Sequence, residues 1–378
     1  MEQKKHWPQV VTLYVLGIAL VLIGHSHSSN RSAYEGTLLF YTVFFIYPFH
    51  MPLFFFLAGF LFQNSDALQR RGYGKWLGAK ALRLLVPYGF WTLLALVPKY
   101  YLEHGGLGGL TPGFVLRTFI MPRSNIWGHF WFIPVLFFAY AIFGAVRTLA
   151  RRVPDRILLP VLAAASLGAY FLPVRTDLFG LADLKGALVF FAFGMLFRAY
   201  FPTERLRAAL QGGTARWAAV AAVLIGTVLA FLLWRSAGEN PFAALIIALG
   251  MILLCWRVGE LVPPGSGMKW LAARNFSIYI FSWFFQAAMM MVCDKLHFSW
   301  IATFFCMFFI GLAGPVVLVA LCERIPLLNK RFFQSRFTLV RVRPFTLGFV
   351  FSYNRAFTGR DNDIILTHDG SPVMLCLL

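Results

Sequence analysis

The stretch FHMPLFFFLAGFLF, residues 49–62, consists mostly of phenylalanine and leucine, yet it contains His50 between Pro48 and Pro52. It lies within the apolar block 36–62, which is longer than the roughly 20 residues that cross a bilayer. Because each proline removes a backbone donor, the sequence predicts a break in this span. An ionisable ring at such a break is a candidate functional group, since buried charges between membrane helices are costly.

The composition extends this prediction to the whole chain of 378 residues. It is 59% apolar and 13% charged, with a mean hydropathy of +0.70, whereas soluble domains are about half apolar and about a quarter charged. We predict an all-α polytopic membrane protein of about ten transmembrane helices over residues 1–322. A basic tail, 323–378, is predicted to be disordered or to form a short strand. The apolar blocks lie at 10–25, 36–62, 84–102, 127–146, 157–174, 186–200, 217–234, 241–258, 276–293 and 300–322.

The net charge of +19 has a topological origin. If the ten spans alternate from a cytoplasmic N-terminus, 26 of the 34 Lys and Arg residues fall on the cytoplasmic side. Without the tail the division is 18 to 8. This positive-inside bias predicts both termini in the cytoplasm and a bacterial inner-membrane location, with no cleaved signal peptide. We expect membrane lipids, and no nucleic acid, as the surroundings of these charges.

Acidic residues and cysteines exclude several classes of site. The fifteen Asp and Glu residues fall in predicted loops, span ends or the tail, which argues against an ion-coupled transporter and against a Ser-His-Asp triad within the membrane. The five cysteines show no metal-ligand spacing. We therefore expect no metal.

Histidines are the ionisable residues that remain at membrane depth. His25 ends the first block, His50 lies in the broken second block, and His129 begins the fourth in WGHFWFIP. A lone histidine is more often a hydrogen-bonded structural residue than a functional one, and this alternative stays open for His25 and His129. The prolines beside His50 favour a functional role there.

Six segments occur in an order typical of one family: LGIALVLIGHSH, FHMPLFFFLAGFLF, KALRLLVPYGFW, WFIPVLFFAY, FFAFGMLFR and NFSIYIFSWFFQ. Across about residues 7–322 the chain resembles the bacterial inner-membrane acyltransferase family 3. In particular it is similar to fucose 4-O-acetylases and polysaccharide O-acetyltransferases. The resemblance implies an enzyme that moves an acyl group, usually acetyl from acetyl-CoA, to a sugar hydroxyl.

The resemblance also implies roles for particular residues. His25 matches the family's candidate catalytic histidine, and Lys80 and Arg83 match a basic pair at the start of the third helix. The chain departs from the family at three positions. Tyr14 stands where a Lys or Arg is common, Ala58 replaces the serine of a Ser-Gly-Phe motif, and Ser282 stands where some relatives have a histidine.

The chemistry itself calls for a base, because alcohols are poor nucleophiles at neutral pH. Histidine, with an ordinary pKa of about 6.5, is the usual residue for this role. We predict that His25 is this base, or a nucleophile that carries the acyl group transiently, and that His50 orients the substrate or relays the proton.

Binding residues are predicted at both faces. Coenzyme A is polyanionic, and the segment 69–83 offers Arg70, Arg71, Lys80 and Arg83 toward the cytoplasm. Topology alone explains most of these charges, so the donor role rests on Lys80 and Arg83, which share a helix face. Trp131 and His129 are candidates for contact with the sugar.

Two functional hypotheses follow from these features. The first is a membrane O-acyltransferase that modifies a cell-surface polysaccharide or its lipid-linked precursor, with acetyl or another acyl group. The alternative is a non-enzymatic lipid or oligosaccharide translocator that uses the broken second span as a gate.

Overall fold

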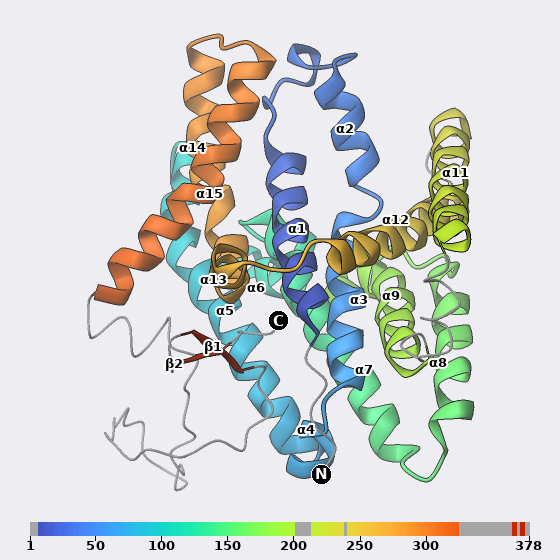
Figure 1. Ribbon diagram of the computed structural model, residues 1–378. Coiled ribbons are helices and arrows are strands. Elements are labelled where there is room, and N and C mark those ends of the chain that lie inside the picture. The colour runs from blue at the N-terminus through green and yellow to red at the C-terminus, as the bar shows by residue number, and fades with distance from the viewer. Residues whose placement is uncertain (1–6, 201–212, 238–239, 325–364, 369–370, 375–378) are drawn as a thin grey trace, which may run out of the picture.

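The computed structural model describes residues 7–200, 213–237, 240–324, 365–368 and 371–374. The described part is a bundle of helices, most of which run up and down in Figure 1, whereas α12 lies across them and α11 stands at the right-hand edge. The first half of the chain contains α1 (Pro8–His25), η1 (Arg31–Ala33), α2 (Leu38–Ile46), α3 (His50–Gln63), α4 (Ala67–Arg71), α5 (Tyr73–His104), α6 (Pro112–Ile120), η2 (Pro122–Ser124), η3 (Gly128–Trp131), α7 (Phe132–Leu149) and α8 (Asp155–Tyr170).

The second half continues with helices and ends with a small hairpin. Its elements are η4 (Leu178–Gly180), α9 (Leu181–Tyr200), α11 (Gly213–Ala237), α12 (Pro241–Leu261), α13 (Ser266–Ala273), α14 (Asn275–Lys295), α15 (Trp300–Arg324), β1 (Ile365–His368) and β2 (Ser371–Met374). The two strands pair antiparallel, with Ile365 opposite Met374. The rest of the tail predicted to be disordered or to form a short strand, 325–364, 369–370 and 375–378, lies outside the described residues.

Eight helical segments of the described chain are long and apolar enough to cross a membrane. The predicted all-α polytopic architecture is therefore confirmed. The two other predicted spans coincide with α8, which has 16 residues, and with α11, whose apolar part Val220–Leu233 is shorter than a full span. The eight segments are Pro8–His25, Leu38–Gln63, Tyr73–His104, Gly128–Leu149, Leu178–Tyr200, Pro241–Leu261, Asn275–Lys295 and Trp300–Leu321.

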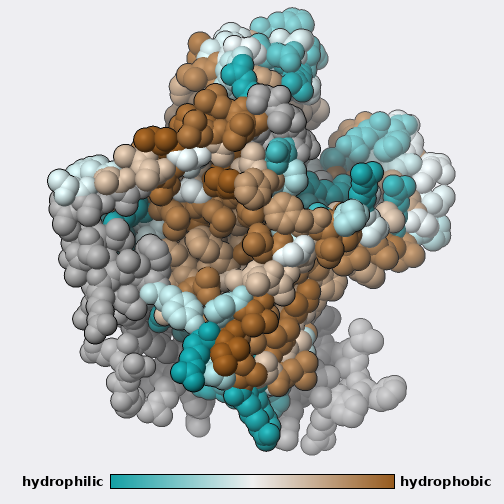
Figure 2. All heavy atoms as spheres, turned by 90° about the vertical axis from the view of Figure 1, so that its right-hand side faces the viewer, coloured by the Kyte–Doolittle hydropathy of each residue, from teal (hydrophilic) through white to brown (hydrophobic). Residues whose placement is uncertain are grey.

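The outer surface of the bundle is apolar. Five exposed apolar side chains lie along one face of α5, with spacings of four, three, one and three residues. They are Val86, Phe90, Leu93, Leu94 and Val97. Figure 2 shows hydrophobic side chains over much of the middle of another face, with hydrophilic ones gathered at its top and lower edge. Soluble proteins rarely expose such a continuous apolar surface to water, whereas a membrane protein exposes it to lipid tails.

Helix α3 is the centre of the bundle. Twelve of its residues are buried, all except Pro52 and Gln63, as expected for a helix that is apolar all round. It packs closely against α9. A Cβ atom added at Gly59 would lie 1.9 Å from the Phe191 carbonyl oxygen, and one at Gly194 would lie 2.0 Å from the Phe56 carbonyl oxygen. The two backbones therefore approach so closely that only glycine fits at these positions.

This close approach predicts a stability effect. Gly194→Ala should lower the free energy of unfolding by about 1–3 kcal/mol, because the methyl group must displace backbone. Gly78→Ala is the matched control, since nothing lies within 4 Å of that position on α5. Alanine is the better helix former there by about 1 kcal/mol, so its thermal midpoint in detergent should stay or rise. Equal midpoints for the two variants would contradict the tight α3–α9 contact.

Candidate active site

A cavity of about 570 Å³ lies where the broken second span meets the end of α1, the short helix η3, and helices α9 and α14. Its volume is within the range of small-molecule sites. The lining residues include His25, Tyr47, His50, Phe55, Arg123, His129, Trp131, Tyr170, Asp183, Phe190, Tyr279, Ser282 and Trp283. The structure therefore brings together His25, His50, His129 and Trp131, four residues that the sequence singled out.

His25 is the last residue of α1 and faces this cavity. The centroid of its ring lies 5.2 Å from the Trp283 ring centroid and 6.2 Å from that of Tyr47. Its ring nitrogens make no hydrogen bond to the described residues. Neither nitrogen is among the buried polar atoms without a partner, so they are not fully buried. The imidazole is thus positioned by aromatic packing, and its nitrogens can serve a ligand in the cavity.

The last turn of α1 is held by side chains from neighbouring helices. The Leu22 carbonyl oxygen accepts hydrogen bonds from Ser26 Oγ at 2.6 Å and from Gln286 Nε2 at 3.0 Å. Gln286 Nε2 also donates to Ser26 Oγ at 3.1 Å, and the Tyr47 hydroxyl donates to the Gly24 carbonyl at 3.2 Å. Carbonyls at a helix end have no partner within the helix, so these bonds fix the turn that carries His25.

The predicted break in the second span is confirmed, because α2 ends at Ile46 and α3 begins at His50. His50 Nδ1 lies 3.1 Å from the Ile46 carbonyl oxygen, an atom left near the break. A carbonyl only accepts, so Nδ1 carries the hydrogen and Nε2 of the neutral ring has a free lone pair. The ring thus adds a second hydrogen bond to a carbonyl that already accepts from the Phe49 amide, and it keeps one basic nitrogen.

His129 is tied to α14 through its backbone and its ring. The Tyr279 hydroxyl donates to the His129 carbonyl, and His129 Nε2 lies 3.4 Å from the Ile280 carbonyl. Its Nδ1 is buried and has no hydrogen-bond partner among the described residues. His129 therefore lines the cavity with one nitrogen unsatisfied.

The segment before His129 is held by a buried amide. Asn125 Nδ2 lies 3.1 Å from the Tyr88 hydroxyl, from Thr92 Oγ1 and from the Thr118 carbonyl. Its Oδ1 accepts from the Trp127 amide at 2.8 Å. About two turns nearer the end of α5, Lys99 donates to the Ile126 carbonyl at 2.6 Å. Residues 118–127 are thereby fixed to α5 independently of the cavity.

Arg123 and Asp183 form an ion pair on the cavity wall. Arg123 Nε and Nη2 donate to the two carboxylate oxygens of Asp183 at 2.8 and 2.6 Å. The Arg123 amide donates to Asp177 at 2.8 Å, and burial raises the pKa of the Asp177 carboxyl. Gly180, at φ +71°, turns the chain between the two aspartates. Asp183 occupies the first turn of α9, where a negative charge suits the helix dipole.

Trp131 is only partly available for stacking on a sugar. The Arg123 guanidinium lies over its ring, 4.1 Å from the centroid. One face of the indole is therefore covered by the cation, as in other arginine–aromatic contacts.

The residues predicted to bind the donor do not line the cavity. Lys80 and Arg83 are half-buried on α5, and Lys80 Nζ lies 3.8 Å from the centre of the Tyr140 ring. Arg83 interacts electrostatically with Tyr140 and with Tyr14, which is buried on α1. Arg70 is an exposed partner of Asp66 at 3.5 Å.

Arg71 is exposed like Arg70. The four residues predicted to bind the donor thus differ in their surroundings. Lys80 and Arg83 interact with buried tyrosines, whereas Arg70 and Arg71 lie at the surface.

Sequence reasoning missed Arg123, Asp183 and Gln286. Asp183 belongs to the acidic residues expected in loops or at span ends, and it lies in the first turn of α9, at the end that the cavity reaches. Arg123 lies in η2, between two predicted spans, where the sequence does not distinguish it from other loop cations. Ser282, noted as a departure from the family, lines the cavity. Among the described residues no three His, Cys, Asp or Glu side chains are grouped as a metal site.

The spans, the apolar exterior and the histidine-lined cavity define a polytopic membrane protein with a candidate catalytic site. Comparison with known proteins identifies its family. A family model described as an acyltransferase domain matches residues 14–320, most of the chain, so the protein belongs to the acyltransferase 3 family. The resemblance inferred from the six segments is confirmed, and the chain is a membrane acyltransferase.

Two relatives support this assignment at low identity. Nodulation protein NolL of Mesorhizobium japonicum is 24% identical over 341 residues, which cover 82% of this chain and 85% of that protein. Nodulation protein NolL of Sinorhizobium fredii is 27% identical over 187 residues, covering 49% of this chain and 47% of that protein. No solved structure matches the chain.

The hydrogen bonds at the end of α1 predict a positioning role for Gln286. Gln286→Leu keeps the side-chain volume and leaves the Leu22 carbonyl with Ser26 as its remaining side-chain donor, which costs about 0.5–1.5 kcal/mol of stability. We expect kcat for acyl transfer to fall about tenfold with little change in KM for the donor, because His25 is displaced rather than removed.

Gln63→Leu is the matched control. Gln63 bonds the exposed Asp155 at 2.8 Å, away from the cavity, and its loss should leave kcat unchanged. A Gln286→Leu enzyme with wild-type kcat would show that the last turn of α1 needs no such support.

Proposed function

We propose that this membrane acyltransferase transfers an acetyl group from acetyl-CoA to a sugar hydroxyl of a cell-surface polysaccharide or its lipid-linked precursor, in a bacterial inner membrane. The observation that supports this proposal is the placement of His25. Its ring faces a cavity of small-molecule size and makes no hydrogen bond to the described protein. It is therefore available to a reacting hydroxyl.

The reaction moves one proton, in two steps through His25, and one acyl group. His25 takes the proton of the sugar hydroxyl as its oxygen attacks the thioester carbonyl. The carbon–sulfur bond then breaks, and the imidazolium returns the proton to the leaving thiolate, which gives an acetyl ester and coenzyme A. Attack by His25 on the thioester first, followed by transfer from an acyl-imidazole, places the same residue at the reacting atoms.

His50 acts beside this step. With Nδ1 bonded to Ile46, its Nε2 can accept a hydrogen bond from a substrate hydroxyl. His50 and His25 line one cavity and both contact Tyr47, at ring-centroid distances of 5.3 and 6.2 Å. This arrangement suits a ring that orients the acceptor or relays its proton.

The donor would bind near Lys80 and Arg83. The phosphates of coenzyme A bind to cations held in fixed positions. Arginine offers a planar fork of N–H donors to a phosphate, whereas lysine offers a compact point charge. Lys80 lies over the Tyr140 ring, and the half-buried Arg83 interacts electrostatically with Tyr14 and Tyr140. Arg70 and Arg71 are exposed, and solvent and salt screen the charge of an exposed residue, so the proposal gives them the smaller part in donor binding.

Replacing the proposed base tests the function directly. His25→Ala should lower acetyl transfer by about 10²- to 10⁴-fold, the usual contribution of a general base. The measurements are transfer of labelled acetyl in membranes and mass spectrometry of surface glycans from deletion and complemented strains. His104→Ala is the control, because His104 stacks on Tyr100 outside the cavity.

Two outcomes would contradict the proposal. A His25→Ala protein that inserts normally and acetylates fully would remove His25 from the mechanism. Loss of polymer export with acetylation intact would favour the translocator.

The donor assignment has its own test. Lys80→Glu and Arg83→Glu should each raise the apparent KM for acetyl-CoA about tenfold or more, since each removes a hydrogen bond to a charged group. Reversing the exposed Arg151 and Arg152 changes the charge of another cytoplasmic loop and should leave this KM unchanged. If both pairs of reversals act equally, the effect is one of general surface charge.

A further inference from the structure

The ion pair on the cavity wall has more hydrogen-bonding capacity than it uses within the protein. A guanidinium group has five N–H donors, and Asp183 takes two of them. Each oxygen of Asp183 keeps a lone pair. The Arg123 side chain is 52% exposed and that of Asp183 is 18% exposed. Donors and acceptors therefore stand side by side at the edge of the cavity.

The Arg123–Asp183 pair is not needed to hold residues 118–127 in place. Residues 118–127 are already fixed by Asn125 and Lys99, and His129 is fixed by Tyr279. An ion pair with an exposed partner contributes little stability, about 0–1 kcal/mol. The pair is therefore better placed to meet a ligand than to hold the fold.

The charge of the wall limits what that ligand can be. Arg123 and Asp183 are the charged residues among those described that line the cavity, and their charges cancel. Asp177 adds a second carboxyl group behind the pair. Lys185, two residues after Asp183, donates instead to the Tyr170 carbonyl at 3.1 Å. A carboxylate or phosphate on the ligand would thus meet no uncompensated cation here and would face Asp183.

We infer that Arg123 and Asp183 form the acceptor subsite of this enzyme and bind neighbouring hydroxyl groups of an uncharged sugar ring. A hydroxyl both donates and accepts, so one hydroxyl can accept from the guanidinium while the next donates to the carboxylate. Because Arg123 covers a face of Trp131, that face of the indole is closed to stacking. This wall therefore recognises the sugar ring through its hydroxyl groups. The inference rests on the proposed sugar acylation and specifies the acceptor of that same cavity.

The test compares acceptors on the purified full-length protein with acetyl-CoA as donor. The probes are methyl glucopyranoside, its monodeoxy analogues and methyl glucopyranosiduronate. The wild type should use the neutral glycoside at least tenfold better, in kcat/KM, than the uronate. At least one deoxy analogue should lose about tenfold, because it leaves one side of the ion pair unpaired.

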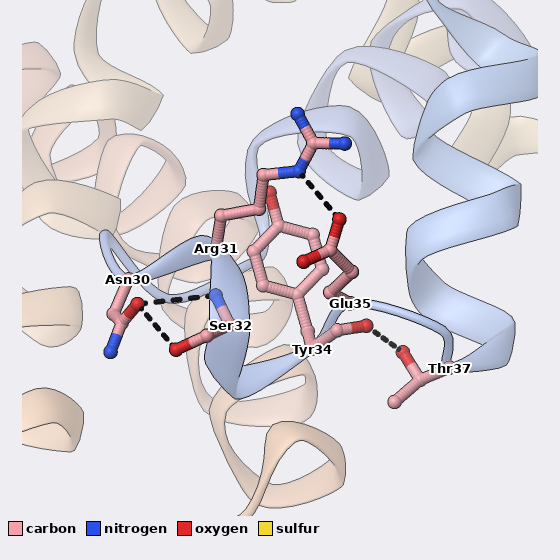
Figure 3. Close-up of polar contacts among 6 residues, drawn as sticks. All are labelled: Asn30, Arg31, Ser32, Tyr34, Glu35 and Thr37. Atoms are coloured by element: carbon pink, nitrogen blue, oxygen red, sulfur yellow. Dashed lines mark hydrogen bonds and ion pairs between the residues drawn. The ribbon is translucent and has the colours of Figure 1, made fainter.

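Variants assign this selectivity to the pair. Asp183→Asn and Arg123→Lys should raise KM for the neutral glycoside about tenfold or more without changing KM for acetyl-CoA. In Asp183→Asn the penalty of the deoxy analogue should largely disappear, because the bond that it measures is already absent. Glu35→Gln is the matched control: it removes a carboxylate from the exposed Arg31–Glu35 pair, which lies outside the cavity (Figure 3).

Each outcome bears on one hypothesis or both. Equal use of the uronate by the wild type overturns the subsite and leaves acyl transfer to sugars standing, and the wild-type comparison needs no folded variant. Unchanged acceptor KM in folded variants also overturns it. Failure of the wild type to acylate any glycoside contradicts the proposed function and the inference that rests on it.

Discussion

Backbone hydrogen bonding in lipid is the constraint on which this structure depends. Within a bilayer each N–H and C=O must find its partner inside the protein. The chain interrupts a span at 47–49 and ends α1 at His25. At the interruption the Ile46 carbonyl accepts from the Phe49 amide and from His50, and at the helix end the Leu22 carbonyl accepts from Gln286 and Ser26. Of these side chains His50 lines the cavity, while Gln286 and Ser26 hold the turn whose His25 faces it.

The loop after His25 is held by polar contacts that lie outside the cavity. Asn30 accepts from the Ser32 amide, Thr37 donates to the Tyr34 carbonyl, and Arg31 pairs with Glu35 (Figure 3). Nearby, Ser28 and Ser29 donate to Asp294 at the end of α14. Exposed polar contacts of this kind are individually weak, so the buried bonds to Leu22 and Gly24 carry more of the positioning of His25.

The family motif around Gly59 acquires a physical explanation from the packing. Ala58, Gly59 and Phe60 are all buried on α3, and the absent side chain of Gly59 lets α9 approach to backbone contact. The replacement of the usual serine by Ala58 places a small apolar residue in a fully buried position. The motif therefore serves helix packing, whereas His50 at the start of the same helix lines the cavity together with residues from other elements.

The sequence by itself determined the class of the protein, the positions of its helices and the break in the second span. Apolar length and proline are local properties, and local properties decide whether a segment can cross a bilayer and where its helix fails. The family segments also pointed to His25. Only the tertiary structure decided that His50, His129 and Trp131 share a cavity with it, and that Arg123 and Asp183, 60 residues apart, form an ion pair there. Such contacts depend on how η2, α9 and α14 pack in space, and no spacing along the chain encodes that distance.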